Sequence, residues 1–239
     1  QRITTDPARP MKDQATTLQV VIKNQGYLST GSSFRVDWYQ DPAAPPVAGE
    51  TGDGFWTVAS LGAGEITTLT TSIVFPQAYT FDFYAQADTL DGNVESDETN
   101  NTFGPADVTV FAEASTSDLC GTLDENTVLT IAHSVYVVTC DVAVAADRSL
   151  WLDPGVIVKF GQTFRVTLAS GATLHAMGID GAEIVFTSLR DDTHGGDTNG
   201  DGTATTPARG DWGGITGECL GTDCSEVTFD HVLVRYGKG

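Results

Sequence analysis

The chain has 239 residues, of which 40% are hydrophobic, enough for a buried core and too many for a disordered polymer. Its 12 Lys and Arg are outnumbered by 32 Asp and Glu, and the formal net charge of −20 excludes nucleic acids and anionic membrane surfaces as partners. No apolar run approaches the roughly 20 residues that span a bilayer, and the opening QRIT contains no signal-peptide core, so we expect no membrane insertion.

The first 112 residues alternate apolar and polar positions between turn signals. In the stretch TTLQVVIKNQG this alternation places Leu18, Val20 and Ile22 on one face of a strand. The same pattern recurs in SSFRVDWYQD, FWTVASLGAGEITTLTTSIVF, YTFDFYAQAD and DGNVESDETNNTFGPADVTVF. About seven short strands within roughly 100 residues, each ended by turn residues, predict an immunoglobulin-like β-sandwich over residues 1–112.

Parts of these stretches, VVIKNQG, SLGAGE and VESDETNNT, resemble the CARDB domain, the cell-adhesion-related module of bacterial and archaeal surface proteins. The resemblance covers residues 1–112 and implies a prokaryotic cell surface and a role in adhesion. Its acidic part, from Glu95 to Asn101, has two interpretations: a cation site, or Asp and Asn side chains that cap the turn before the last strand. Capping is favoured, because the alternate-oxygen spacing of calcium loops is missing there.

Residues 113–239 repeat a shorter unit. The stretch YVVTCDVAVAADRSLWLDPGVIVKF is followed by FRVTLASGATLHAMGIDGAEIVFTS and then by WGGITGECLGTDCSEVTFDHVLVRYG, with a period of roughly 23–27 residues. The expected alignment sets Val142-Ala143-Val144 beside Phe164-Arg165-Val166, Leu150-Trp151-Leu152 near Thr173-Leu174-His175, and Val156-Ile157-Val158 near Glu183-Ile184-Val185, with Val232-Leu233-Val234 in the last slot. Short β-branched strands divided by Gly, Asp and Ser corners favour a parallel β-helix.

The first of these repeats also resembles the opening coils of right-handed β-helix proteins of the pectate-lyase-like superfamily, which recur in large secreted bacterial surface proteins. The sequence therefore predicts an all-β protein. An immunoglobulin-like β-sandwich (1–112) would be followed by a short right-handed parallel β-helix of about three coils (113–239). An acidic, glycine-rich insertion near residues 189–210 would separate the second coil from the third.

The insertion carries the candidate metal ligands. Asp197, Asn199 and Asp201 stand at alternate positions before a glycine, the spacing with which calcium loops gather hard oxygen ligands, and the carbonyl of Thr203 would add another. The pattern is not that of an EF-hand, since Ala208 stands where the bidentate Glu belongs. Bound Ca²⁺ would stabilise the fold; the alternative is a solvated Asp/Gly turn. The negative charge that this Glu would have supplied is expected from the flanking carboxylates Asp191, Asp192 and Asp211.

The cysteines are Cys120, Cys140, Cys219 and Cys224, and they form no zinc-binding pattern with the histidines. One pair about 20 residues apart and one very close pair indicate the disulfides Cys120–Cys140 and Cys219–Cys224; the alternative is buried free thiols. The first bridge would join the N-terminal cap of the β-helix to its first coil, and the second would fix a corner of the third coil. Paired cysteines, an acidic surface and few lysines together indicate an extracellular protein.

Catalysis is not expected of this segment. Lys159, Arg165, Asp153 and Glu183 could face outward on neighbouring coils, but about three coils rise only roughly 15 Å, too short for the cleft of a polysaccharide-cleaving β-helix. No nucleophile or metalloprotease motif is present. Lys159 is therefore interpreted as a surface lysine whose stem lies along its strand.

We expect a non-catalytic, calcium-stabilised structural or adhesive protein of a cell surface, with copies of itself, other surface proteins or glycans as partners. One alternative is the N-terminal portion of a secreted carbohydrate-active enzyme whose catalytic coils lie beyond residue 239. Another is a glycan-binding module with a platform of aromatic side chains, two of which alternate toward the core. The platform residues would be Trp38, Tyr39, Phe55 and Trp56.

The last strand, in HVLVRYGKG, is followed by no capping segment. An uncovered β-helix end exposes unpaired backbone groups and apolar side chains, so we expect it to be covered. The cover would be a continuation of the chain, or the next subunit of a head-to-tail filament.

Overall fold

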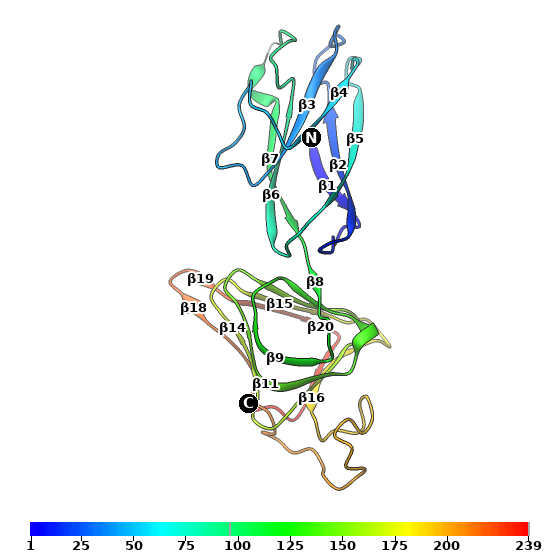
Figure 1. The fold of residues 1–239 in the computed structure, drawn as a ribbon, viewed down its shortest axis with the longest axis vertical. Helices are drawn as coiled ribbons and strands as arrows, with labels where there is room; N and C mark the ends of the chain where they lie inside the picture. Colours follow the sequence, from blue (N-terminus) through cyan, green and yellow to red (C-terminus); the bar gives the residue numbers. More distant parts are fainter. Residues whose placement is uncertain (96, 239) are drawn as a thin grey trace. The chain divides into compact units, whose positions relative to one another are not determined.

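The computed structural model describes residues 1–95 and 97–238; Ser96 and Gly239 lie outside the described residues. The chain divides into two compact units, Gln1–Val110 and Phe111–Gly239, close to the boundary expected after residue 112 (Figure 1). Regular structure in the described residues is β-strand, apart from the 3₁₀ turns η1 (Glu98–Asn100) and η2 (Ile131–His133). None of the described helices is long and apolar enough to cross a membrane.

The first unit is built from antiparallel strands with the orders β1-β2-β5 and β4-β3-β6-β7. In β2 the alternation expected from the sequence is observed, because Leu18, Val20 and Ile22 are all buried. They share one hydrophobic core with side chains of the other sheet, among them Phe81 and Phe83. The strands are β1 (Arg2–Asp6), β2 (Ala15–Lys23), β3 (Phe34–Gln40), β4 (Gly54–Val58), β5 (Ile66–Val74), β6 (Thr80–Ala87) and β7 (Thr102–Thr109).

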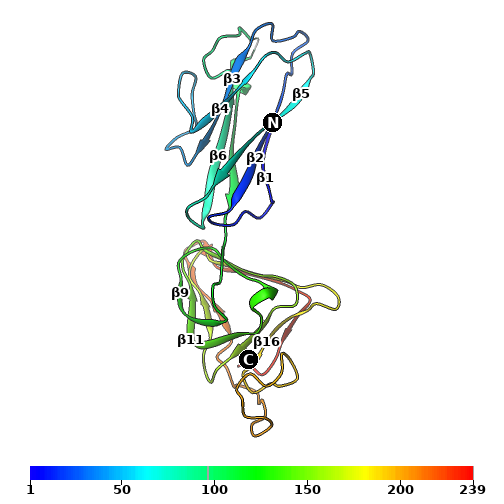
Figure 2. The same cartoon turned by 45° about the vertical axis from the view of Figure 1, so that its right-hand side comes forward.

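The second unit pairs most of its strands in parallel, in the orders β20-β15-β12-β10-β8 and β17-β14-β11-β13-β16-β21, with β9 also beside β11. Its strands are β8 (Ala112–Glu113), β9 (Asp118–Leu123), β10 (Thr127–Leu129), β11 (Tyr136–Val144), β12 (Ser149–Leu152), β13 (Ile157–Phe160), β14 (Val166–Leu168), β15 (Thr173–Met177), β16 (Ile184–Ser188), β17 (Ile215–Gly217), β18 (Cys219–Leu220), β19 (Asp223–Cys224), β20 (Glu226–Asp230) and β21 (Val232–Val234). Figure 2 shows the chain of this unit turning through successive rounds of roughly triangular outline. The pair β18 and β19 is an antiparallel hairpin, and β21 lies beside β16, the slot expected for it.

The pairing corrects the register expected from the sequence. Val142 pairs with Val166 rather than with Phe164, which lies in the corner before β14. Leu150 pairs with Leu174, one residue from the expected partner, and the pairing of β13 with β16 is displaced by one residue as well. Because side chains alternate between the two faces, the buried leucines of successive rounds must lie over one another, and this fixes the register.

At the end of the insertion the chain re-enters the core at Trp212. We did not expect this burial from the sequence. The Trp212 side chain is fully buried and stacks on Phe160, with ring centroids 4.0 Å apart and planes 9° apart. Its Nε1 donates a hydrogen bond to the carbonyl of Arg235 at 2.7 Å. Trp212 therefore closes the far end of the insertion against the core of the second unit.

Both expected disulfides are present. Cys120 of β9 is bonded to Cys140 of β11, with Cα atoms 4.8 Å apart, so this bridge joins parallel neighbours. Cys219 is bonded to Cys224 across the β18–β19 hairpin, with Cα atoms 4.0 Å apart. Buried free thiols, the alternative interpretation, are wrong for these four residues.

Candidate cation site in the acidic insertion

The acidic insertion connects β16, which ends at Ser188, to β17, which begins at Ile215. Figure 1 shows it in yellow and orange as an irregular loop that projects from the parallel strands of the second unit. Its ends are fixed by the strands on either side and by Trp212, so the position of its polar residues is set by contacts with the second unit.

The carboxylate of Asp197 organises the tip of the insertion. Its Oδ1 accepts hydrogen bonds from the backbone N–H groups of Gly200 at 2.8 Å and Asp201 at 3.2 Å, and its Oδ2 accepts one from Gly202 at 2.8 Å. Gly200 and Gly202 have φ values of 72° and 68°, which L side chains rarely adopt. The backbone thus wraps round this carboxylate and brings the alternate residues Asn199 and Asp201 together.

Asp201 has one bonded and one unbonded carboxylate oxygen. Its Oδ2 accepts hydrogen bonds from the Asn199 amide at 2.9 Å and from the Thr205 hydroxyl. Its Oδ1 is buried and has no hydrogen-bond partner in the described part of the chain. The Thr205 hydrogen bond lowers the pKa of Asp201, so the carboxylate is charged at neutral pH. A buried, charged oxygen without a donor is unfavourable in a folded protein and suits a bound cation.

Asp201 lines a cavity of about 230 Å³ together with Asn199 and Asp211. Asp211 is already paired. Its Oδ2 accepts hydrogen bonds from the Ser188 hydroxyl at 2.7 Å and from a backbone N–H at 3.0 Å, while its Oδ1 lies 3.4 Å from the guanidinium of Arg190. Of the two carboxylates at this cavity, Asp201 is therefore the one with an oxygen left to bind an ion.

Asp191 lies at the base of the insertion and is fully buried. It accepts hydrogen bonds from the Thr187 hydroxyl at 2.7 Å, from the backbone N–H of Thr193 at 3.1 Å and from the hydroxyl of the same Thr193, and Nδ1 of His194 lies 3.0 Å away. Burial by itself would raise the pKa of Asp191, but these hydrogen bonds outweigh it and lower the pKa to about 2. Asp191 is a charged anchor surrounded by protein donors.

The seven predicted ligands thus do not gather at one point. Asn199, Asp201 and Asp211 share a cavity that Asp191 and Asp192 do not line, and Thr203 is exposed. Across residues 1–95 and 97–238, no three His, Cys, Asp or Glu residues are placed to hold a metal ion together. Asp191 is bonded by threonine and backbone donors close to it in the chain, and Asp211 by Ser188, Arg190 and a backbone N–H. Oδ1 of Asp192, by contrast, is buried without a hydrogen-bond partner in the described part of the chain.

Lys159 is buried beneath the insertion, which corrects the expectation of a surface lysine. Its Nζ donates a hydrogen bond to the carbonyl of Gly196. Burial lowers the pKa of Lys159, and the neighbouring carboxylates of Asp191, Asp192 and Asp197 oppose this shift. The residues that cover the lysine are distant from VIVKF in the sequence, so no local pattern indicated the burial. The consecutive glycines Gly195 and Gly196 were the available signal, because such a pair lets the backbone approach closely.

The acidic stretch of the first unit forms a cap. Asp97 is the N-cap residue of η1 and accepts a hydrogen bond from the backbone N–H of Thr99 at 3.0 Å. Glu98 accepts one from the backbone N–H of Glu95 at 2.8 Å. This confirms the capping interpretation for the described residues of the stretch; Ser96 lies outside them.

The aromatic platform considered for glycan binding consists of Trp38, Tyr39, Phe55 and Trp56. Tyr39 is only 5% exposed, and Trp38 stacks on Phe83 with ring centroids 6.1 Å apart. Phe55 is covered on one face by the guanidinium of Arg35, 3.9 Å from its ring centroid. Tyr39 and Trp38 therefore pack within the first unit, and Phe55, although 56% exposed, does not form one exposed surface with them.

Comparison with known proteins concerns the first unit. Residues 2–105 match the model of the CARDB family. The crystal structure of the CARDB domain of a Pyrococcus furiosus protein, in complex with di-metal ions, is 28% identical with a TM-score of 0.37, and the match covers 45% of this chain and 83% of that one. The solution NMR structure of a CARDB domain from the same organism is 27% identical with a TM-score of 0.33, covering 41% and 82%. No curated protein matches the chain. Residues 2–105 of this chain form a CARDB domain.

Proposed function

We propose that this chain is a non-catalytic structural or adhesive part of an extracellular cell-surface protein, stabilised by Ca²⁺. The observation that carries the proposal is that the buried charged groups of Lys159 and Asp191 are hydrogen-bonded to other groups of the protein. Buried charged side chains are candidates for acid–base catalysis. Here, however, Lys159 donates a hydrogen bond to the Gly196 carbonyl, and Asp191 accepts hydrogen bonds from Thr187 and Thr193. Charged groups that are already paired with the protein attach a loop rather than act on a substrate.

We propose an immunoglobulin-like sandwich for the CARDB unit and the opening coils of a right-handed parallel β-helix for the second unit. The sandwich is supported by antiparallel sheets that share one core. The β-helix is supported by the parallel ladder β10, β12, β15 and β20, in which each strand comes from a successive round of the chain. Right-handed turning follows from the strong preference of parallel crossovers.

The proposed extracellular location is supported by covalent and electrostatic features. Disulfides persist in oxidising compartments, and this chain contains Cys120–Cys140 and Cys219–Cys224. A net charge of −20 keeps the surface solvated and attracts cations. A prokaryotic cell surface is the location that the CARDB resemblance implies.

We propose that the third round of the second unit contacts further strands. Val227, Phe229, Leu233 and Val234 on β20 and β21 are 45, 42, 43 and 50% exposed. In the described residues, β17, β20 and β21 each lie at the end of a sheet. Exposed apolar side chains beside unpaired backbone groups favour strand addition. The added strands would belong to the same protein, to another copy or to another surface protein.

The proposed calcium site is the tip of the insertion. Asp197, Asn199 and Asp201 would supply side-chain oxygens and Thr203 a carbonyl oxygen, with water completing the shell. Among these residues of the tip, Asp201 has a buried Oδ1 with no hydrogen-bond partner in the described part of the chain. The flanking carboxylates Asp191, Asp192 and Asp211 would add negative potential around the ion.

Thermal unfolding in Ca²⁺ and in a chelator tests this proposal. At a hundredfold excess of Ca²⁺ over Kd, binding to the folded state adds about 3 kcal/mol to the free energy of unfolding. We therefore expect Ca²⁺ to raise the melting temperature of the second unit and to leave that of the CARDB unit unchanged. Asp201→Ala should abolish the rise, whereas Asp118→Ala, at an exposed carboxylate on β9, should retain it. Identical melting curves with and without Ca²⁺ would refute the site, and cleavage of a polysaccharide by the purified chain would refute the non-catalytic role.

A further inference from the structure

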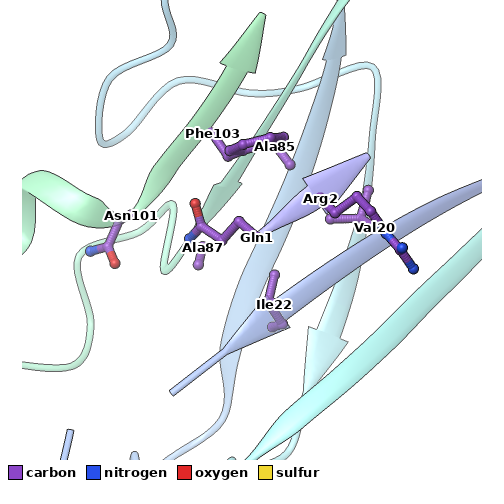
Figure 3. Close-up of a pocket in the computed structure, with 8 residues that line it drawn as sticks. All are labelled: Gln1, Arg2, Val20, Ile22, Ala85, Ala87, Asn101 and Phe103. Atoms are coloured by element: carbon purple, nitrogen blue, oxygen red, sulfur yellow. The ribbon is translucent and has the colours of Figure 1, made fainter. Parts of the chain in front are cut away.

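A groove of about 480 Å³ lies in the CARDB unit, between the loop that follows β2 and the segment that precedes β7. Its volume falls within the range of small-molecule sites. Gln1, Ile22, Ala87 and Asn101, shown in Figure 3, line both this groove and a narrow gap beside it. None of the groove's lining residues belongs to the insertion, so this site is separate from the proposed calcium site.

Asn93 places an unpartnered amide on the groove wall. Its side chain is only 9% exposed, and it is held by a hydrogen bond from the Ser32 hydroxyl to Oδ1 at 2.5 Å and by its own backbone N–H, which donates to Asp88 at 2.7 Å. Nδ2 of Asn93 is buried, with no hydrogen-bond partner among the residues described. Buried amides are nearly always paired, so this donor needs an acceptor, which an ordered water or an oxygen of a bound ligand can supply.

The rim of the groove is apolar and exposed. Tyr27, Leu28 and Val94 are 98, 82 and 102% exposed. The loop that carries the first two is fixed, because Nδ2 of Asn24 donates to the carbonyls of Leu28 at 2.8 Å and Leu61 at 3.0 Å. Large apolar side chains held out in water beside a polar groove mark a binding surface.

The remaining lining combines amides and carboxylates with apolar residues such as Phe34 and Leu61. The amides of Asn100 and Asn101 both donate and accept hydrogen bonds, as sugar hydroxyls require, and each has one N–H already bonded within the protein. Glu95 and Asp97 supply acceptor oxygens. Among the described residues, Lys23 is the one cationic side chain that lines the groove, against these two carboxylates, and the whole chain carries a net charge of −20. Phosphorylated, sulfated or carboxylated ligands are therefore disfavoured, and an uncharged polyol is favoured.

We propose that this groove binds a neutral sugar unit of a glycan, with the Tyr27 ring against a face of the sugar and Nδ2 of Asn93 donating to one of its oxygens. Aromatic rings combine a large apolar surface with little loss of side-chain freedom, which suits the apolar face of a pyranose. The binding unit lies within the CARDB domain and does not involve the acidic insertion.

Titration calorimetry and amide NMR shifts of the 239-residue chain with N-acetylglucosamine, galactose, mannose and their short oligomers test the proposal, all in chelator so that the outcome is independent of Ca²⁺. We expect saturable binding of at least one of these sugars. Tyr27→Ala and Asn93→Asp should each weaken it about tenfold. Phe55→Ala removes a 56% exposed aromatic ring that does not line the groove and should leave the affinity unchanged.

The proposal is overturned if none of these sugars binds saturably, or if Tyr27→Ala binds as well as the unaltered chain. Tighter binding of a sulfated sugar or of an apolar peptide at the same residues would equally overturn it. Because Tyr27 is almost fully exposed, its replacement decides the matter even where Asn93→Asp disturbs folding.

Discussion

Lys159 has no exposed surface, and its ammonium group is held by the Gly196 carbonyl and by nearby carboxylates. Lys159→Met keeps the length of the side chain but leaves that carbonyl and the charge of Asp191 without a cation. We expect urea unfolding of the second unit to show a loss of about 3 kcal/mol. Lys23→Met, at an exposed end of β2, should change stability by less than about 0.5 kcal/mol. A loss below about 1 kcal/mol for Lys159→Met would show that this lysine does not anchor the insertion.

Gly195 and Gly196 offer a matched pair at the same turn. Both have positive φ, 71° and 74°, so alanine is strained at either position by about 1 kcal/mol. A Cβ on Gly195 would lie 2.5 Å from Cγ2 of Val135, whereas one on Gly196 would meet nothing within 4 Å. We expect Gly195→Ala to lower the free energy of unfolding by about 2–3 kcal/mol and Gly196→Ala by about 1 kcal/mol. Equal losses would contradict the close packing of the insertion against Val135, the residue before β11.

Because Asp191 anchors the insertion as a charged carboxylate, the stability of the second unit should depend on pH. The folded-state pKa of Asp191, about 2, lies below the ordinary 3.8, so its stabilising effect is complete above about pH 4 and is lost as the pH falls through 2. The basic side chains of Lys159 and His194 lie near it. We expect the melting temperature of the second unit to fall more steeply between pH 4 and pH 2 in the unaltered chain than in Asp191→Asn. Parallel curves in that range would contradict this role.

At the scale of secondary structure elements, the sequence predicted strands better than their register. The burial of Leu18, Val20 and Ile22 in β2 follows from a period of two, which is a local property of a half-buried strand. The partner of Val142 could not be read in the same way. Phe164 has the character of a strand residue but lies in a corner, and corners of unequal length leave no local signal that fixes which residues stack.

The two disulfides should contribute unequally to stability. The sequence separations are 20 for Cys120–Cys140 and 5 for Cys219–Cys224, and a longer closed loop restricts the unfolded chain more. Replacing both cysteines of the first pair by alanine should therefore lower the unfolding free energy of the second unit by about 3 kcal/mol. The same change in the hairpin should cost less. Denaturant unfolding of the two double variants measures the difference, and the opposite order would contradict the argument.

At the scale of the whole molecule, composition and spacing indicated an all-β chain, paired cysteines and the acidic insertion, but not what the insertion covers. Lys159, the donors around Asp191 and the stacking of Trp212 on Phe160 all depend on the loop returning to strands distant in sequence. The groove of the CARDB unit was missed for the same reason, since residues 23–30 meet Asn93, Val94, Glu95 and Asn101 only in the fold. Contacts between distant segments leave no periodic pattern in the sequence.

Amide hydrogen exchange of the whole chain, compared in Ca²⁺ and in chelator, tests most directly the claim that parallel strands support a calcium-stabilised insertion. We predict that β11 to β16 are protected in both conditions, because their ladder and core form without the ion. Ca²⁺ should slow exchange within the insertion, above all at Gly200, Asp201 and Gly202, whose N–H groups bond Asp197. Equal exchange of the insertion in both conditions, or loss of protection throughout the strands in chelator, would contradict the claim.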